Sequence, residues 1–325
     1  MREIYFNKAL NEALREKMSE DESVLLIGED IGVYGGAFKV TEGLLESFGE
    51  KRVIETPISE NSFMGVATGL AMMGFKPVVE IMFMDFIALA FDQILNHTTK
   101  FHYMYNGQVN IPMVIRTPAG AKGGYGPSHS QSLEALFIGI PGLKVVAPSD
   151  PYTAKGLLKS AINDPNPVLF VENKVLYGTK GEVPEESYLI PLNQAMIRRE
   201  GTDLTIISYS RMLQLSLKVA SFLEKQGVTL EVLDLISLSP LDEEAIIASI
   251  KKTKRVVVVD EGCKTGGIGA EISALLAEEA IEYLDAPIIR VGLPNVPIPA
   301  SIFLERHVIP DEQKILDAVD QCLNW

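Results

Sequence analysis

The sequence predicts an α/β protein with two doubly wound domains, because short apolar strands alternate with amphipathic helices along the whole chain. A polar stretch rich in Gly, Pro and Glu interrupts this alternation near the middle. The length of 325 residues also suits two domains. We therefore expect a first domain over residues 1–178, a linker over 179–201 and a second domain over 202–325.

In the first half, apolar residues at helical spacing predict a helix over 7–18, with Asn7 as its expected N-cap. Asp150 and the proline after it indicate the start of another helix. Buried strands of a parallel sheet read as short apolar runs. The predicted strands are 23–30, 52–56, 76–83, 111–118, 143–149 and 167–172, and the other helices are 60–74, 85–104 and 150–164.

The second half repeats the alternation and predicts a second parallel sheet covered by helices. The predicted strands are 203–210, 229–238, 254–262 and 287–294, and the predicted helices are 211–227, 242–253, 269–280 and 311–323. Before the third of these helices, the string "TGGIGAE" follows a strand. It is read as a tight turn, with anion binding at the helix N-terminus as the alternative.

Composition excludes several classes of function. The net charge of −14 argues against nucleic acid as a partner, since phosphate binding needs clustered Lys and Arg. The two cysteines, Cys263 and Cys322, form neither a metal-type pair nor a disulfide framework. No apolar run approaches a membrane span and the N-terminus lacks a signal core. We expect a protein of the cytoplasm, or of an organelle matrix after processing, with no membrane partner.

The candidate chemical residues follow predicted strands. In such sheets ligands bind beyond the carboxyl ends of the strands. Glu29 ends one strand, Glu60 follows another and His129 follows a third, within the glycine-rich string "GGYGPSHSQS". A carboxylate after a strand is often only a helix cap, whereas a loop histidine between Gly, Pro and Ser has few structural duties.

Longer strings carry a family resemblance: "ETPISENSFMG", "EIMFMDF", "GPSHSQSLEALF", "PGLKVVAPSDPYTAKGLLKSAI" and "NPVLFVENKVLYG". Together with the two-domain pattern, they resemble the beta subunit of the heteromeric 2-oxo acid dehydrogenases, which include pyruvate, branched-chain 2-oxo acid and acetoin dehydrogenases. The resemblance covers nearly the whole chain. It implies a transketolase-like pyrimidine-binding domain followed by a transketolase C-terminal-like domain.

The resemblance also implies a thiamine diphosphate site shared between two subunits. The family's diphosphate and magnesium motif, "GDG", does not occur in this sequence. An alpha subunit is therefore expected to supply the diphosphate and magnesium half, in an α2β2 heterotetramer. Glu60 matches the glutamate that donates to the pyrimidine ring, a task suited to a buried carboxyl with a raised pKa. Phe86 matches the aromatic residue packed on that ring, and Glu29 and Ile58 match positions lining the same pocket.

His129 matches the family's active-site histidine. The family transfers its acyl group to a lipoyl disulfide on a partner, the dihydrolipoamide acyltransferase, and the departing sulfur needs a proton. A histidine suits that proton transfer near neutral pH. Ser128 and Ser130 either orient the imidazole or bond to the loop backbone. Some family members also hold a structural potassium ion. By position it would involve Met113, Ala161, Ile162, Asp164 and Asn166, where an ordinary helix-ending turn is the alternative.

Oxidative decarboxylation of a 2-oxo acid, with pyruvate as first candidate, is the expected activity. Acetoin and branched-chain 2-oxo acids stay open as substrates, because "MFMDF" and "GGAF" do not settle the acyl pocket. A split subunit of transketolase or deoxyxylulose-phosphate synthase type, with no lipoyl partner, is an alternative enzyme. A flavoprotein-like electron-transfer subunit, also of two α/β domains, is the non-enzymatic alternative.

Overall fold

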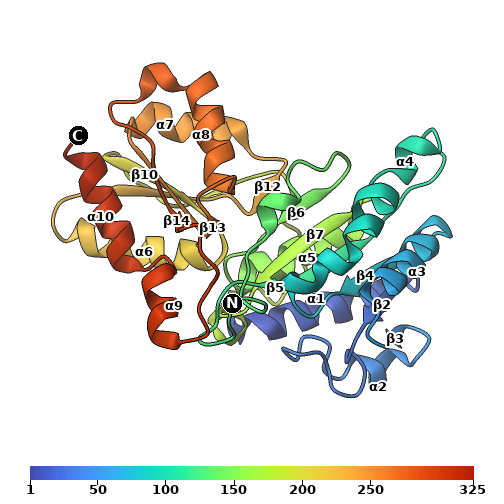
Figure 1. Cartoon of the computed structure of the whole chain (residues 1–325). Coiled ribbons are helices and arrows are strands. Elements are labelled where there is room, and N and C mark those ends of the chain that lie inside the picture. Colours follow the sequence, from blue (N-terminus) through green and yellow to red (C-terminus); the bar gives the residue numbers. More distant parts are fainter. The chain divides into compact units, whose positions relative to one another are not determined.

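The computed structural model describes residues 1–325, and the chain folds into two compact units (Figure 1). The first unit comprises Met1–Ala119 and Phe137–Leu192, and the second comprises Gly120–Leu136 and Asn193–Trp325. Residues 120–136, which carry His129, therefore group with the C-terminal half of the chain. None of the helices combines the length and the apolar character needed to cross a bilayer.

The first unit is built on a parallel sheet with the strand order β6-β7-β5-β4-β2-β3. Its strands are β2 (Val24–Gly28), β3 (Val53–Glu55), β4 (Lys76–Glu80), β5 (Val114–Ala119), β6 (Lys144–Val146) and β7 (Val168–Asn173). Every residue of β2, β5 and β7 is buried, as continuous apolar runs predict for strands covered on both faces.

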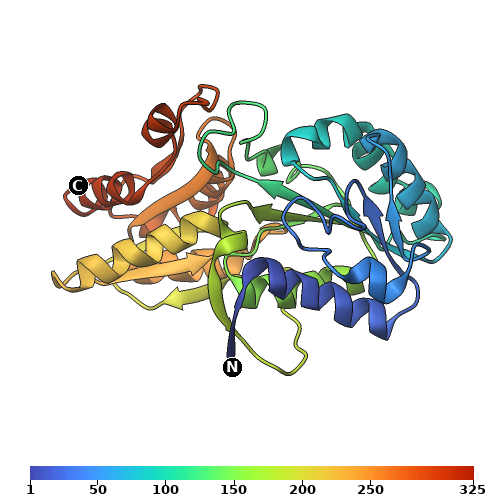
Figure 2. The same ribbon diagram turned by 90° about the horizontal axis from the view of Figure 1, so that it is seen from below.

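Helices cover both faces of this sheet. In Figure 2, α1 and α5 lie along one face, and the helical segments from α3 to α4 lie along the other. The helices of the unit are α1 (Phe6–Glu20), α2 (Leu44–Phe48), α3 (Glu60–Met72), α4 (Phe101–Met104), α5 (Pro151–Asn163) and the short η4 (Leu176–Gly178). The expected cap of α5 is present, because Asp150 accepts a hydrogen bond of 2.8 Å from the Thr153 amide.

Two local predictions in this unit were wrong. Asn7 does not cap α1, which begins at Phe6; its side chain instead donates to the Phe38 carbonyl. The segment 85–104 is not one α-helix but a 3₁₀ helix η1 (Met84–Ala90), a π-helix η2 (Gln93–Thr98) and α4. The Thr99 hydroxyl and amide both donate to the Ile94 carbonyl five residues earlier, at 2.9 and 3.2 Å, and this contact widens the turn.

The segment expected to be a linker, 179–201, contains two strands. β8 (Lys180–Val183) pairs antiparallel with β1 (Arg2–Tyr5) within the first unit. β9 (Met196–Arg199) pairs antiparallel with β11 (Leu230–Asp234) and forms one edge of the second sheet. The polar residues of this stretch thus lie in edge strands and turns.

The second unit has the strand order β14-β13-β10-β11-β9, parallel except for β9. Its other strands are β10 (Leu204–Ser208), β11 (Leu230–Asp234), β12 (Ser237–Ser239), β13 (Val256–Cys263) and β14 (Ile289–Leu293). Its helices are η3 (Glu134–Leu136), α6 (Ser210–Glu224), α7 (Glu243–Thr253), α8 (Ile268–Glu279), η5 (Ile281–Tyr283), α9 (Ile302–Val308) and α10 (Glu312–Leu323).

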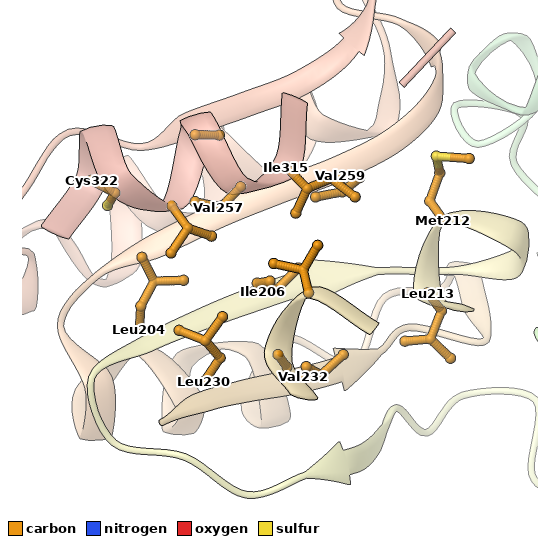
Figure 3. Packing of buried hydrophobic residues seen from close by; sticks show 14 of the residues in the cluster. Leu204, Ile206, Met212, Leu213, Leu230, Val232, Val257, Val259, Ile315 and Cys322 are labelled. Atoms are coloured by element: carbon orange, nitrogen blue, oxygen red, sulfur yellow. The ribbon is translucent and has the colours of Figure 1, made fainter. Parts of the chain in front are cut away.

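The main core of this unit lies between the sheet and the helices α6 and α10 (Figure 3). Ile206 and Val257 project from neighbouring strands toward Ile315 of α10, and Cys322 is buried in the same cluster. The apolar residues of these strands and helices therefore pack against one another in the core. The loops, including the loop before α8, follow the carboxyl ends of the strands.

Candidate active site

The strand order of the first sheet reverses between β2 and β4. From β2 the chain passes to β3 on one side, and it then returns to β4 on the other side. In open parallel sheets, ligands bind beyond the carboxyl ends of the strands at such a reversal. Glu29 follows β2 directly and Glu60 follows the loop after β3. Two of the predicted carboxyl groups therefore lie at the point of the sheet where a ligand site is expected.

Glu60 is the first residue of α3 and is buried, with 6% of its surface exposed. A carboxyl group in the first turn of a helix faces the unpaired amides and the positive end of the helix dipole. Gly65 of α3 allows close packing here, since a Cβ at this position would lie 3.2 Å from Gln93 Oε1 of η2. The absence of a side chain at Gly65 is thus explained by the approach of the π-helix.

Glu29 is also buried, with 7% of its surface exposed, and its Oε1 atom has no hydrogen-bond partner. Burial raises the pKa of Glu29, and the negative charge of Glu60 raises it further, while a backbone hydrogen bond from Ser59 opposes the rise. A raised pKa means that Glu29 holds a proton more readily than an ordinary glutamate does.

Phe86 and Ile58 lie on the segments that flank these carboxyl groups. Phe86 belongs to η1, is half-buried, and meets Phe83 edge to face with 6.1 Å between ring centroids. Ile58 is 82% exposed and precedes Glu60 in the loop after β3. An exposed isoleucine beside buried carboxyl groups does not contribute to the core, so it is available to contact a ligand or another chain.

A buried ion network beneath this edge was not predicted from the sequence. Arg116 of β5, 1% exposed, donates to Glu172 of β7 through Nε at 2.7 Å and Nη2 at 2.8 Å, and to Glu80 of β4 through Nη1 at 2.6 Å. Burial lowers the pKa of Arg116, but the charges of Glu172 and Glu80 outweigh burial and raise it. In the sequence, this network is indicated by a charged residue within each of three otherwise largely apolar strands, "VIRTPA", "VLFVEN" and "KPVVE".

Aromatic rings link this network to Phe86. The Tyr177 hydroxyl donates to Glu172 Oε2 at 2.6 Å, and the Tyr177 ring stacks on Phe38 at 4.6 Å between centroids. Phe38 meets Phe83 edge to face at 5.9 Å, and Phe83 in turn meets Phe86. Such edge-to-face contacts fix ring orientation as well as burying area. The ring of Phe86 is therefore held by a continuous series of packed side chains.

His129 belongs to the second unit, where it lies in the loop 120–131. The residue is half-buried, and its Nδ1 atom lies 3.0 Å from the Ser128 hydroxyl. Ser130 is fully buried and its hydroxyl has no hydrogen-bond partner. Of the two serines considered for orienting the imidazole, Ser128 makes that contact.

The residues considered for potassium surround the end of α5. The Ala161 carbonyl accepts from the Asp164 amide at 3.2 Å, and the Met113 carbonyl accepts from the Val168 amide at 2.9 Å. The Asp164 carboxylate contacts the Lys144 ammonium and the Asn166 amide, and Ile162 precedes it in the last turn of α5. Asp164 therefore already has a cationic partner, and potassium binding stays a prediction.

The glycine-rich turn before α8 is filled by a carboxylate of the chain itself. Asp260 of β13 accepts from the amides of Gly262 and Gly269, the latter at 3.4 Å, and from the Tyr209 hydroxyl at 3.4 Å. Burial raises the pKa of Asp260 to about 6, and these amides oppose the rise. A small cavity of about 170 Å³ lies beside it, lined in part by Tyr209, Cys263 and Ile268. Asp260 thus takes the position in which an external anion would bind.

Comparison with known proteins identifies both halves of the chain. Residues 2–180 match the family model described as transketolase, pyrimidine binding domain, and residues 193–315 match transketolase, C-terminal domain. The predicted fold class, two α/β domains of these kinds in this order, is confirmed. A solved structure, "Split gene transketolase, inactive beta4 tetramer", superposes with a TM-score of 0.80 at 25% identity, covering 99% of this chain and 98% of that chain.

Curated relatives extend over essentially the full length. The pyruvate dehydrogenase E1 component subunit beta of Porphyra purpurea is 47% identical over 324 residues, which cover 100% of this chain and 98% of that protein. The beta subunit of acetoin:2,6-dichlorophenolindophenol oxidoreductase from Bacillus subtilis is 45% identical, covering 99% of this chain and 98% of that protein. The chain therefore belongs to the family of beta subunits of thiamine diphosphate-dependent 2-oxo acid dehydrogenases, the E1 components.

Proposed function

We propose that this chain forms half of a thiamine diphosphate site and that an alpha subunit, in an α2β2 heterotetramer, supplies the diphosphate and magnesium half. The observation that carries the proposal is the pair of buried carboxyl groups, Glu29 and Glu60, at the reversal of the strand order. The sequence contains no "GDG" motif for a diphosphate-bound magnesium ion. A structural potassium ion near Asp164 is not part of this proposal, because Lys144 already contacts that carboxylate.

The residues at the sheet edge fit an aminopyrimidine. Glu60, which is buried, is assigned to hydrogen-bond the pyrimidine nitrogen and to exchange a proton there. The unpartnered Oε1 of Glu29 offers an acceptor to a donor group of the ring. Phe86 is assigned to pack on the ring face, and Ile58 to line its edge. The bound cofactor supplies the carbanion chemistry, while these residues orient it and handle protons.

His129 is assigned to the second half-reaction, in which the acyl group passes to the lipoyl group of a dihydrolipoamide acyltransferase. An imidazole on a glycine-rich loop can donate a proton to the departing sulfur. The contact between its Nδ1 atom and the Ser128 hydroxyl supports this role, because a hydrogen bond at a ring nitrogen restrains the orientation of the imidazole.

The proposed substrate is pyruvate. Pyruvate dehydrogenase beta subunits from Porphyra purpurea and Gracilaria tenuistipitata are 47% and 48% identical to this chain. Acetoin is the second candidate, because the Bacillus subtilis acetoin subunit is 45% identical over nearly the same length. A transketolase-type reaction is less well supported, since the split transketolase shares only 25% identity.

The test is co-expression with the candidate alpha subunit, followed by assays of the purified complex. Reduction of an artificial electron acceptor is measured with pyruvate, with a branched-chain 2-oxo acid and with acetoin, and release of CO2 is measured for the two acids. Transfer between sugar phosphates is measured in parallel. The proposal expects the highest kcat/KM with pyruvate. Preference for acetoin would select the second candidate, and sugar transfer without 2-oxo acid turnover would overturn the proposed function.

A further inference from the structure

A buried glutamate holds the backbone of the loop 120–131, which carries His129. Glu305, in α9, is 5% exposed. Its Oε1 atom accepts from the Gly123 amide at 2.9 Å, and its Oε2 atom accepts from the Gly124 amide at 2.7 Å. One carboxylate thus accepts from two successive amides. Glu305 lies 182 and 181 residues after these two glycines in the sequence. Hydrogen bonds to a charged acceptor are the stronger kind and are stronger still when buried.

The backbone at this contact has a conformation that only glycine adopts easily. Gly123 and Gly124 have φ values of +84° and +90°. There is also little space for a side chain, because a Cβ on Gly124 would lie 3.3 Å from Ile302 Cγ1. Gly126 is similarly close to Ala300, with 3.3 Å from its Cβ position to the alanine Cβ. The glycines of "GGYGPSHSQS" therefore serve the approach of the loop to the segment 300–305.

A second carboxylate holds the start of the same loop. Glu261 Oε1 accepts from the Ala121 amide at 2.8 Å. Arg211 Nη1 donates to the Ala121 carbonyl at 3.3 Å and lies 3.6 Å from Glu261 Oε1. Carboxylates thus hold the loop backbone both at Ala121 and at Gly123–Gly124, on the way to His129.

We propose that Glu305 is a positioning residue for His129: its carboxylate orders the Gly123–Gly124 backbone so that the imidazole is presented in one place. The inference rests on the role proposed for His129 in acyl transfer. Glu305 is not assigned a contact with substrate or cofactor. A displacement of about 1 Å at a reacting group can cost about 100-fold in rate, so loss of this contact should slow the step that uses His129.

The experiment uses the assembled heterotetramer with three beta-subunit variants. Glu305→Ala removes both acceptors, and Glu305→Gln keeps one oxygen but turns an amide NH₂ toward a backbone donor. Glu312→Ala is the matched control, because Glu312 is an exposed glutamate of the same unit, paired with Lys218 at 3.1 Å. The first readout is hydrogen–deuterium exchange of the peptide spanning 120–131, and the second is the rate of each half-reaction.

Glu305→Ala is expected to speed exchange in the loop about 10-fold or more, the factor that corresponds to losing a hydrogen bond to a charged group. Reductive acylation of a lipoyl domain should fall roughly 10- to 100-fold, with decarboxylation by an artificial acceptor within about 3-fold of wild type. Glu305→Gln should lie between wild type and Glu305→Ala in both readouts, and Glu312→Ala should match wild type. Combining Glu305→Ala with His129→Ala should slow acylation no further than His129→Ala alone.

The failures of the two proposals can be told apart. If His129→Ala leaves acylation unchanged, the role assigned to His129 is wrong, and positioning by Glu305 falls with it even if the loop exchanges faster. If His129→Ala slows acylation but Glu305→Ala does not, the positioning role alone is overturned. Equal slowing of both half-reactions by Glu305→Ala, or loss of the heterotetramer, would show a general structural role and would also overturn it.

Discussion

Arg116 and Glu172 form a two-point ion pair between the adjacent strands β5 and β7, with 2.7 Å between Nε and Oε1 and 2.8 Å between Nη2 and Oε2. Both side chains are almost fully buried. Removing water from two charges is costly, and only good geometry and further hydrogen bonds repay that cost. Here Glu80 and Tyr177 complete the hydrogen bonding. Glu80 is the last residue of β4, one of the two strands that flank the reversal of strand order.

Replacing Arg116 should therefore destabilise the first unit strongly. Arg116→Met leaves Glu172 and Glu80 buried beside each other without a counter-charge, so we expect a loss of about 3–5 kcal/mol in the free energy of unfolding. Urea denaturation of the full chain, followed by circular dichroism, measures it. Lys218→Met serves as control, because its pair with Glu312 is exposed and should contribute within about 1 kcal/mol. Similar losses in both variants would contradict the role of the network.

The sequence predicted features that depend on neighbours along the chain. The start of α5 is an example, because Asp150 and Thr153 cap it within four residues. The placement of Glu60 after a strand is another, because parallel strands present their carboxyl ends at one edge of the sheet. The role of Glu60 in cofactor binding comes from the family resemblance and stays a prediction.

Features that depend on distant contacts were missed. The partners of Arg116 lie 36 and 56 residues away in the chain, so no local pattern shows that the three charges meet. The segment 85–104 has the apolar periodicity of one α-helix, yet it folds as the 3₁₀ helix η1, the π-helix η2 and the short α4, and η1 and η2 pack against α3. Tertiary packing overrides helix propensity in such cases. The contact of Glu305 with the His129 loop spans still more of the chain.

Glu60→Gln should prevent activation of the cofactor without preventing assembly. The amide keeps the size and part of the hydrogen bonding of the carboxyl group, but it cannot supply a proton. We expect exchange of the thiazolium proton in the reconstituted complex to slow by roughly 10²–10⁴-fold. Glu46→Gln, at an exposed position of α2, is the control. Exchange at the wild-type rate in Glu60→Gln would remove Glu60 from the mechanism.

Cofactor binding should depend on the alpha subunit. If the diphosphate and magnesium half of the site lies on another chain, this chain alone lacks most of the contacts with the charged part of the cofactor. We expect calorimetry on the isolated chain to show affinity for thiamine diphosphate at least about 100-fold weaker than that of the complex, a deficit of about 2.7 kcal/mol. Tight, magnesium-dependent binding without any partner would contradict the shared site.

Asp260 should make the second unit more stable in mild acid than near neutrality. Its folded pKa of about 6 lies above the ordinary aspartate value of 3.8. The folded state therefore holds a proton that the unfolded state has released, and the stability gained is lost as pH rises toward and through 6. Between pH 5 and pH 8 this loss is roughly 1 kcal/mol. Asp260→Asn cannot titrate, so urea denaturation across this range should show a shallower decline, and parallel curves would contradict the assignment.

His129→Ala should separate the two half-reactions. A group that only donates a proton to the lipoyl sulfur is not needed for decarboxylation, so that rate should stay within a few fold of wild type. Reductive acylation should fall by about 10²–10⁴-fold, the usual contribution of a general acid. Ser128→Ala, which removes the hydroxyl 3.0 Å from Nδ1, should give a smaller loss in the same step, because the imidazole stays in the loop but loses that hydrogen bond. A variant that loses both activities together with the heterotetramer would indicate misfolding. Full acylation by folded His129→Ala would remove His129 from the mechanism, because the proton for the sulfur would then come from another group or from water.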